Sequence, residues 1–429
     1  MLVSRHARAA LAVSLLVVPS AFMAAPRHPA PSRTAKPECA ADNAGLTLPK
    51  GFCAMIVADS LAGVRHIVAM PNGDLFVSSM KSGVVALRDT RGTGRADVIE
   101  DWKTGFRSSE VRMHNGYLYV ETSNAIVRYP VKAGSLTPAG PADTMVSGFP
   151  AGGNHTTKTF VITDDGTMYV DVGSATNSCQ VKDRGNESPG LDPCVERDIR
   201  AGIWQFRADT PGQKASEGIH FGVGIRNGVA LALDPSDHTL YAMQHGRDQL
   251  FANWPRLFDA EKSAETPAEE LFHVTRAGDD FGWPYCYYDR QIKLKVLAPE
   301  YGGDGKTAGR CAGNKGNVAS FPGHWAPNGL AFYTGTSFPA KYRNGVFIAF
   351  HGSWNRAPLP QAGSHVVFQP MVKGKATGEY EVFAEGFNPL TAGKPGHKPT
   401  GLAVAPDGSL LVADDLGGRI YRIIYTGSK

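Results

Sequence analysis

Short runs of alternating apolar and polar residues, separated by Asn-Gly or Asp-Gly turns, recur along most of the chain. Residues 159–163 and 168–172, for example, alternate on either side of the turn at Asp165-Gly166. Two such runs around a tight turn are typical of a β-hairpin. Six hairpins of this kind are predicted. They lie at residues 67–78, 111–120, 160–172, 231–243, 330–350 and 402–413.

Six units of about four strands each predict an all-β fold, a six-bladed β-propeller with inserted loops. Residues 52–57 are expected to add a strand to the last blade and to close the ring, which removes open sheet edges. The longest insertions are expected between Met243 and Leu330, where residues 253–271 predict a loop with a short helix. A β-sandwich, or two stacked β-domains, is the alternative architecture. Further strand candidates lie at residues 84–87, 125–129, 202–206 and 419–424.

The composition agrees with a large globular β-protein. The 429 residues are 42% hydrophobic and 20% charged, and the 49 glycines and 29 prolines indicate many turns and few long helices. The net charge of +4 is small and scattered along the chain, so that nucleic acid is not an expected partner.

The N-terminus predicts export. Residues 1–25 read as a signal peptide, with Arg5 and Arg8 ahead of an apolar stretch at 9–18 that is too short to span a bilayer. No transmembrane anchor is therefore expected, and the protein is predicted to be periplasmic or secreted. Residues 26–44 form a flexible, Pro-rich segment, and residues 45–429 form the propeller domain.

Six cysteines in an exported chain suggest disulfides. Of the fifteen possible pairings, the sequential one closes three short loops, and the sequence alone leaves the pairing open. Zinc is not expected, because no two cysteines have CxxC spacing. In order, the cysteines are Cys39, Cys53, Cys179, Cys194, Cys286 and Cys311.

Polar residues at the strand entrances are the candidates for chemistry. A propeller brings one strand entrance from every blade to a common axis, so that residues far apart in sequence converge there. Cationic donors and imidazoles at these entrances suit an anionic, carboxylate-rich ligand and leave a histidine available as a base. They are His155, Arg226-Asn227, residues 244–248, His351 and His397-Lys398.

Common catalytic signatures are absent from the sequence. We find no nucleophile elbow, P-loop, HExxH motif or dinucleotide fingerprint, and the Gly-rich residues 222–228 lack the strand-then-helix setting of a GxGxxG motif. Hydride chemistry would therefore require a cofactor other than a dinucleotide.

His155 ahead of its hairpin is followed by four motifs, at residues 224–233, 243–248, 281–286 and 398–415. With these motifs in this order, the chain resembles the soluble quinoprotein glucose/sorbosone dehydrogenases, from about Leu48 to Ile424. The resemblance rests on His155 ahead of its hairpin and on four further motifs. The cysteine-bearing segments are most similar to the sorbosone dehydrogenase branch. The four motifs are GIRNGVALAL at 224–233, MQHGRD at 243–248, FGWPYC at 281–286 and KPTGLAVAPDGSLLVADD at 398–415.

The resemblance implies a six-bladed propeller that binds pyrroloquinoline quinone (PQQ) and calcium. His155 would be the general base that takes the hydroxyl proton while hydride passes to the quinone. The backbone carbonyls of Gly246 and Arg247 would help to hold calcium. The residues implied to bind the cofactor are Arg226, Asn227, His245, His351 and Lys398.

Three of these positions depart from the glucose-oxidising members of the family. This chain has His245 and then Gly246-Arg247 where they carry Gln and then Gly-Pro, His351 where they have Lys, and Lys398 where Arg is usual.

The function implied is oxidation of an aldose, a sugar aldehyde such as sorbosone, or a polyol, with electrons passing to an external acceptor, a cytochrome or a quinone. Two alternatives belong to other classes. One is a calcium-dependent propeller lactonase or esterase, and the other is a non-catalytic propeller that binds carbohydrate or a partner.

Overall fold

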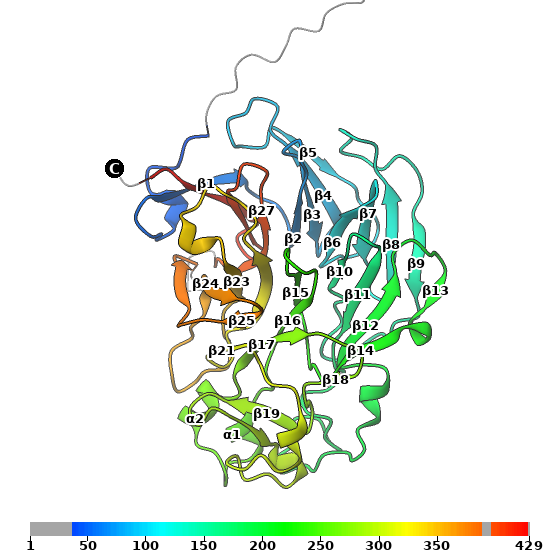
Figure 1. The fold of residues 1–429 in the computed structure, drawn as a ribbon, viewed down its shortest axis with the longest axis vertical. Helices are drawn as coiled ribbons and strands as arrows, with labels where there is room; N and C mark the ends of the chain where they lie inside the picture. Colours follow the sequence, from blue (N-terminus) through cyan, green and yellow to red (C-terminus); the bar gives the residue numbers. More distant parts are fainter. Residues whose placement is uncertain (1–36, 388–395, 428–429) are drawn as a thin grey trace, which may run out of the picture.

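The computed structural model describes residues 37–387 and 396–427, and six of the seven sheets in these residues are arranged around a common axis (Figure 1). The signal peptide predicted at 1–25 lies outside the described residues. The first three blades are β2 (Val64–Ala69), β3 (Leu75–Ser79), β4 (Gly83–Arg88), β5 (Val98–Asp101); β6 (Val111–His114), β7 (Tyr117–Glu121), β8 (Ala125–Pro130), β9 (Asp143–Ser147); and β10 (Phe160–Ile162), β11 (Thr167–Val172), β12 (Gly202–Arg207), β14 (Ile219–Val223).

The fourth to sixth blades follow the same antiparallel order. The six-bladed propeller is thereby confirmed, and the β-sandwich alternative is wrong. These blades are β15 (Ala230–Leu233), β16 (Leu240–Gln244), β17 (Glu269–Val274), β21 (Ala319–Phe321); β22 (Pro327–Phe332), β23 (Gly345–His351), β24 (Ser364–Val372), β26 (Glu381–Ala384); and β27 (Pro399–Val404), β28 (Leu410–Asp414), β29 (Arg419–Tyr425), β1 (Phe52–Ala58). Two-residue strands β13 (Gln213–Lys214), β18 (Asp279–Asp280) and β25 (Lys375–Ala376) extend outer edges.

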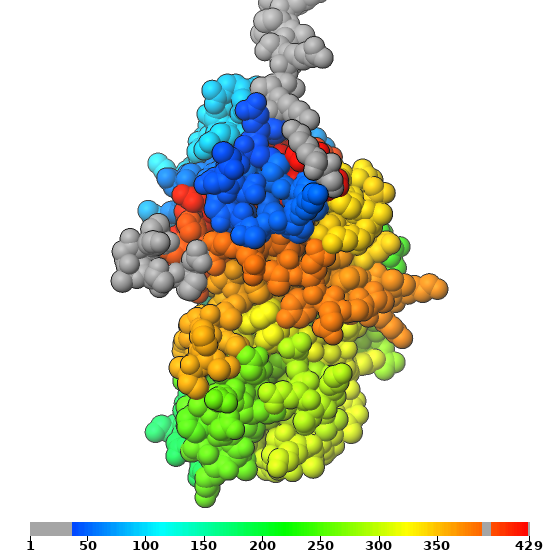
Figure 2. Space-filling view, turned by 90° about the vertical axis from the view of Figure 1, so that its left-hand side faces the viewer, coloured from blue at the N-terminus to red at the C-terminus, as the bar shows by residue number. Residues whose placement is uncertain are grey.

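The ring closes through the N-terminal strand, as predicted. β1 pairs antiparallel with the C-terminal β29, so that the two ends of the domain share the sixth blade. The Phe52 ring lies edge-on to Phe338, Tyr342 and Phe383 of the fifth blade at centroid distances of 4.8, 5.5 and 5.0 Å. Figure 2 shows this N-terminal segment, in blue, against the orange and red segments of those blades. The closure therefore ties the chain ends together and packs them on a third segment.

Apolar side chains fill the spaces between neighbouring blades. Val57, Leu75 and Leu411 belong to one cluster between the sixth and first blades, and Tyr241 and Ile348 belong to another between the fourth and fifth. Because the flat faces of the sheets bury the apolar residues, the strand entrances at the axis are left for polar residues.

Two neighbouring insertions of the fourth blade project from one end of the molecule (Figure 1). The insertion between β16 and β17 contains α1 (Leu250–Asn253) and α2 (Ala260–Glu265), and the insertion between β17 and β21 contains β19 (Cys286–Asp289) and β20 (Leu294–Leu297). The predicted short helix is present as α2. The prediction of loop or helix as far as residue 271 is wrong, because Glu269 and Glu270 pair with β16 and β21 as part of β17.

The six cysteines are paired in sequential order. The disulfides are Cys39–Cys53, Cys179–Cys194 and Cys286–Cys311. The first of them holds residues 37–44, part of the segment predicted to be flexible, against β1, where Ala40 N also donates to Ala54 O over 2.9 Å. Among the described residues, no helix is long and apolar enough to cross a bilayer.

Candidate functional site

Two loops of the third and fourth blades meet at one end of the axis. Within a blade the first strand is antiparallel to the second, so the entrance of the first lies beside the exit of the second. His155, ahead of β10, accordingly donates its backbone N–H to Ser174 O after β11 over 3.2 Å, and His245, after β16, donates to Asn227 O ahead of β15 over 3.0 Å. This rule of topology brings His155, Asn227 and His245 to the same end of the propeller.

His155 has one ring nitrogen occupied. Its Nδ1 lies 2.9 Å from both the carbonyl oxygen and the hydroxyl of Ser174. Since the carbonyl can only accept, Nδ1 carries the hydrogen and Nε2 keeps its lone pair. Burial, reinforced by the charge of Arg226, holds the pKa of His155 well below its ordinary value. His155 is therefore a neutral imidazole that can accept a proton at Nε2.

His245 is held differently. Its Nε2 donates to the carbonyl oxygen of Pro327 in the neighbouring blade over 3.0 Å, which leaves Nδ1 as the lone-pair nitrogen. Burial lowers the pKa of His245 to about 4, and the positive charge of Arg226 acts in the same direction. This imidazole is neutral as well.

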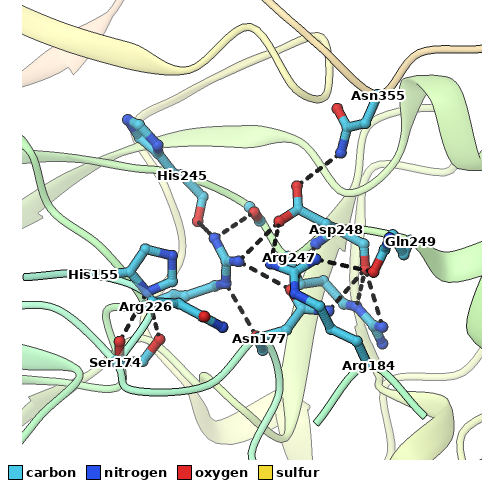
Figure 3. Close-up of polar contacts among 12 residues, drawn as sticks. His155, Ser174, Asn177, Arg184, Arg226, His245, Arg247, Asp248, Gln249 and Asn355 are labelled. Carbon is cyan, nitrogen blue, oxygen red and sulfur yellow. Dashed lines mark hydrogen bonds and ion pairs between the residues drawn. The ribbon is translucent and has the colours of Figure 1, made fainter. Parts of the chain in front are cut away.

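Arg226 is buried in a cage of oxygen atoms (Figure 3). Nε donates to Asn177 O at 3.0 Å, and Nη2 donates to Asn177 Oδ1 at 2.9 Å and to Asp248 Oδ2 at 3.1 Å. Nη1 donates to His245 O at 3.3 Å and to Gly246 O at 2.9 Å. All five N–H groups of the guanidinium thus have protein partners.

A second charged cluster joins the fifth, sixth and first blades. His351 Nε2 lies 2.9 Å from Asp415 Oδ1, and Arg65 Nη1 donates to Asp415 Oδ2 over 2.7 Å. Burial lowers the pKa of Lys398, while the charge of Asp415 opposes that shift. Side chains of Arg65, Asp415 and His351 are 16%, 17% and 23% exposed, so the cluster is reachable from solvent.

The two residues predicted to hold calcium, Gly246 and Arg247, make other contacts. Gly246 O accepts from Arg226, while Gly246 N donates to Glu269 Oε2 over 2.8 Å. The side chain of Arg247 turns toward the insertions, where it pairs with the buried Glu300 and donates to Asn253 Oδ1 over 3.1 Å. The loop therefore links the axis to the insertions through Arg247.

Comparison with known proteins agrees with this architecture. The family described as TrAA12-like matches residues 46–426, nearly the whole chain. The chain belongs to the TrAA12-like family. The predicted relation to this group of propeller proteins is confirmed, whereas the sorbosone dehydrogenase branch stays a prediction.

Solved structures share the TrAA12-like fold at low identity. The holo PQQ domain of pyranose dehydrogenase from Coprinopsis cinerea has a TM-score of 0.72 at 18% identity, covering 91% of this chain and 98% of its own. The calcium structure of a family AA12 protein from Trichoderma reesei has a TM-score of 0.72 at 18% identity, covering 92% and 99%. An uncharacterised protein of Borreliella burgdorferi is 32% identical over 211 residues, 47% of this chain and 48% of that relative, so that the match spans about half its length.

Of the residues expected at the axis of this TrAA12-like propeller, the structure joins His155, Arg226 and His245 directly or through one neighbour. His351 and Lys398 belong to the second cluster around Asp415, and protonation of His351 would lower the pKa of His245 further. Asn227 lies beside His155 but turns its buried Oδ1 to no hydrogen-bond partner among the described residues. His397 instead pairs with Asp414 at 2.6 Å.

Arg65 and Asp415 were not predicted from the sequence. Arg65 lies in β2, two residues before the first predicted hairpin, and so occupies the strand entrance of the first blade. Asp415 lies within the quoted 398–415 motif, directly after β28. Both residues could have been predicted from the rule that strand entrances converge on the axis.

Three buried ionisable groups around the start of β10, Asp171, Glu121 and Lys158, were also not predicted. Asp171 is fully buried and both its carboxyl oxygens lack a hydrogen-bond partner among the described residues. Burial raises the pKa of Asp171 to about 8 and that of Glu121 to about 7. The charge of Lys158, whose ammonium donates to Thr156 O over 2.6 Å, opposes both shifts.

Proposed function

We propose that this protein is a PQQ-dependent dehydrogenase that oxidises the hydroxyl or aldehyde group of a sugar, a sugar aldehyde or a polyol. The observation that carries the proposal is the convergence of a neutral His155, with Nε2 free of a partner among the described residues, and a cluster of cations at the same end of the axis. The solved structures described above share the fold at less than one-fifth sequence identity. The function is therefore a proposal that goes beyond this shared fold.

The residues present fit a flat tricarboxylate such as PQQ. Arg65 and Lys398 together carry two positive charges against the one negative charge of Asp415, and His351 is neutral because burial lowers its pKa. Among the described residues, the Lys398 ammonium has no hydrogen-bond acceptor, and Arg65 donates to Asp415 through Nη1. The remaining donors are available to carboxylates of a ligand.

When bound, PQQ would supply a two-electron acceptor for hydride. His155 Nε2 would take the proton of the substrate hydroxyl, or of the hydroxyl of a hydrated aldehyde, as hydride leaves the carbon that carries this hydroxyl. Ser174 keeps Nδ1 protonated and fixes the plane of the ring, and the Arg226 charge favours the neutral form of His155 before proton transfer.

The calcium ion implied by the family resemblance does not fit the contacts of the Gly246 loop, because Gly246 O already accepts from a guanidinium. We therefore assign no step to a metal. The lactonase alternative needs a metal at the axis. Within residues 37–387 and 396–427, one group of three side chains is close enough together to share a metal ion: Cys179, Cys194 and Glu196. Both cysteines of this group are joined in a disulfide, so the group does not support the lactonase alternative.

Export to the periplasm or beyond, and transfer of electrons to an external cytochrome or quinone, remain part of the proposal. Three disulfides support an oxidising compartment.

The test is a titration of the purified apoprotein with PQQ, followed by absorbance, and then a dye-reduction assay over a panel of aldoses, sugar aldehydes and polyols. Saturable binding of one PQQ and sugar-dependent dye reduction are expected. A protein that binds no PQQ and reduces no dye with any sugar would be a binding propeller instead.

A further inference from the structure

We infer that the guanidinium of Arg226 takes the place of a metal cation at the axis, so that this protein binds its quinone cofactor without calcium. The inference deepens the proposed function and rests on it for the identity of the cofactor. The contacts of Arg226 and the charges around it carry the argument.

The atoms around the guanidinium are those that a hard cation prefers. Arg226 donates to the backbone carbonyls of Asn177, His245 and Gly246, to the side-chain amide oxygen of Asn177 and to the carboxylate of Asp248. Calcium in proteins is bound by carbonyl, amide and carboxylate oxygens of this kind. The oxygen cage is therefore already filled by a cation that is part of the chain.

A calcium ion on Gly246 O would lie too near this charge. Calcium binds its oxygens at about 2.3–2.6 Å, and Nη1 of Arg226 lies 2.9 Å from the same oxygen. The divalent ion and the guanidinium would then repel each other in a buried setting with little screening. Binding of calcium requires that Arg226 give up Gly246 and leave the cage.

The surroundings oppose that movement. Asp248, the one carboxylate of the cage, is shared with Arg184 at 2.9 Å and with the Asn355 amide at 2.8 Å (Figure 3). His324 Nδ1 lies 3.6 Å from the same carboxylate, which raises the pKa of His324 against the effect of burial. A second carboxylate, Glu269, accepts from Gly246 N at 2.8 Å, and burial raises its pKa to about 7. Arg226 and Arg184 offset the charges of these two carboxylates, so that no excess negative charge is left to attract a divalent ion.

The next residue adds to this effect. The Arg247 guanidinium donates to the backbone carbonyl of Asp248 at 3.2 and 3.1 Å and is buried. Two arginine side chains therefore donate to carbonyls of the 246–248 loop, Arg226 to Gly246 O and Arg247 to Asp248 O. Both oxygens face positive charge supplied by the protein.

The experiment measures calcium and PQQ binding separately. Purified protein is freed of metals with EDTA, and equilibrium dialysis with radioactive calcium counts bound ions with and without PQQ. PQQ affinity is then measured by absorbance titration in excess calcium and in excess EGTA. We expect less than one-tenth of a calcium per protein, as an order of magnitude, and PQQ dissociation constants that agree within about twofold.

One bound calcium per protein, or a PQQ affinity at least about tenfold weaker in EGTA, would overturn the inference. Failure to bind PQQ under either condition would count against the proposed function, while the calcium count without PQQ would still decide whether the cage takes the ion. The two failures are therefore distinguishable.

Two variants sharpen the result. Arg226→Ala opens the cage, so that calcium should now bind and restore part of the lost PQQ affinity. Arg184→Ala is the matched control, because it removes another partner of Asp248 that does not contact Gly246, and its PQQ binding should stay independent of calcium. Calcium rescue of Arg184→Ala but not of Arg226→Ala would contradict the assignment.

Discussion

Arg65 Nη1 donates to Asp415 Oδ2 over 2.7 Å although 350 residues separate them in sequence. The bond joins the first blade to the sixth beside His351 and Lys398. It shows how ring closure, which places β1 and β29 in one sheet, also assembles the charged cluster that we propose for anion binding.

Removing either cation of this cluster, Arg65 or Lys398, should weaken cofactor binding. For Arg65→Ala and Lys398→Ala we expect PQQ affinity to fall roughly 10- to 100-fold, because each loses a charge-assisted hydrogen bond worth about 1.5–3 kcal/mol. Absorbance titration measures the effect. Lys341→Ala is the control, since Lys341 is 59% exposed and pairs with Glu381 at the outer edge of the fifth blade. Equal losses in all three variants would show that the effect is not local.

The pH profile of the enzyme should extend to the acid side of an ordinary histidine. Burial holds the pKa of His155 well below 6.5, so the neutral base form persists as the pH falls through that value. We expect kcat/KM to stay level from roughly pH 8 down past pH 6.5. A profile of kcat/KM that halves near pH 6.5 would indicate a base in a different environment.

Gly173 is predicted to be indispensable for the geometry of His155. A Cβ at position 173 would lie 2.5 Å from the Cβ of His155 and 2.9 Å from Asn227 Oδ1, both closer than real contacts. Gly173→Ala should therefore displace His155 and lower kcat by about tenfold or more. Gly313→Ala, where a Cβ meets nothing within 4 Å, is the matched control. Wild-type kcat in Gly173→Ala would mean that His155 is not the base.

Asp171 should make stability depend on pH. Its pKa is raised by burial from 3.8 to about 8, so between these values the folded state keeps a proton that the unfolded chain has lost. Stability is then greatest at low pH and falls as the pH rises, by at most about 1.4 kcal/mol per pH unit.

The isosteric Asp171→Asn should flatten that decline, which chemical denaturation at several pH values would measure. Asp192→Asn is the control, because Asp192 is 53% exposed. Parallel stability curves for Asp171→Asn and the native protein would show that Asp171 does not titrate as proposed. Glu121, with a pKa of about 7, leaves a residual slope in either case.

Local chemistry made much of the fold predictable. The Asp165-Gly166 turn with its alternating flanks specifies a hairpin without reference to the rest of the chain, and Gly166 has the positive φ of 82° that such a turn requires. Repetition of that hairpin then predicts the propeller. The topology in turn predicts that His155, His245 and Lys398 meet at one end.

The residues that were not predicted from the sequence depend on distant partners. Arg65 reads as an exposed charge in a strand until Asp415 is brought beside it. Asp171 reads as the solvent-facing member of an alternating strand, but the third and fourth blades bury it beneath Gly228. Likewise, the family resemblance predicted Gly246 as a calcium ligand. The sequence alone cannot show that the side chain of Arg226 donates to the Gly246 carbonyl.

The most direct test of the account compares two proteins loaded with PQQ. Mixing each with a sugar substrate without oxygen, and following the quinone absorbance in a single turnover, separates cofactor binding from chemistry. We predict that His155→Ala binds PQQ nearly as tightly as the native protein but reduces it roughly 10²- to 10⁴-fold more slowly. Reduction at the native rate in His155→Ala, or failure of the native protein to bind PQQ, would contradict the account.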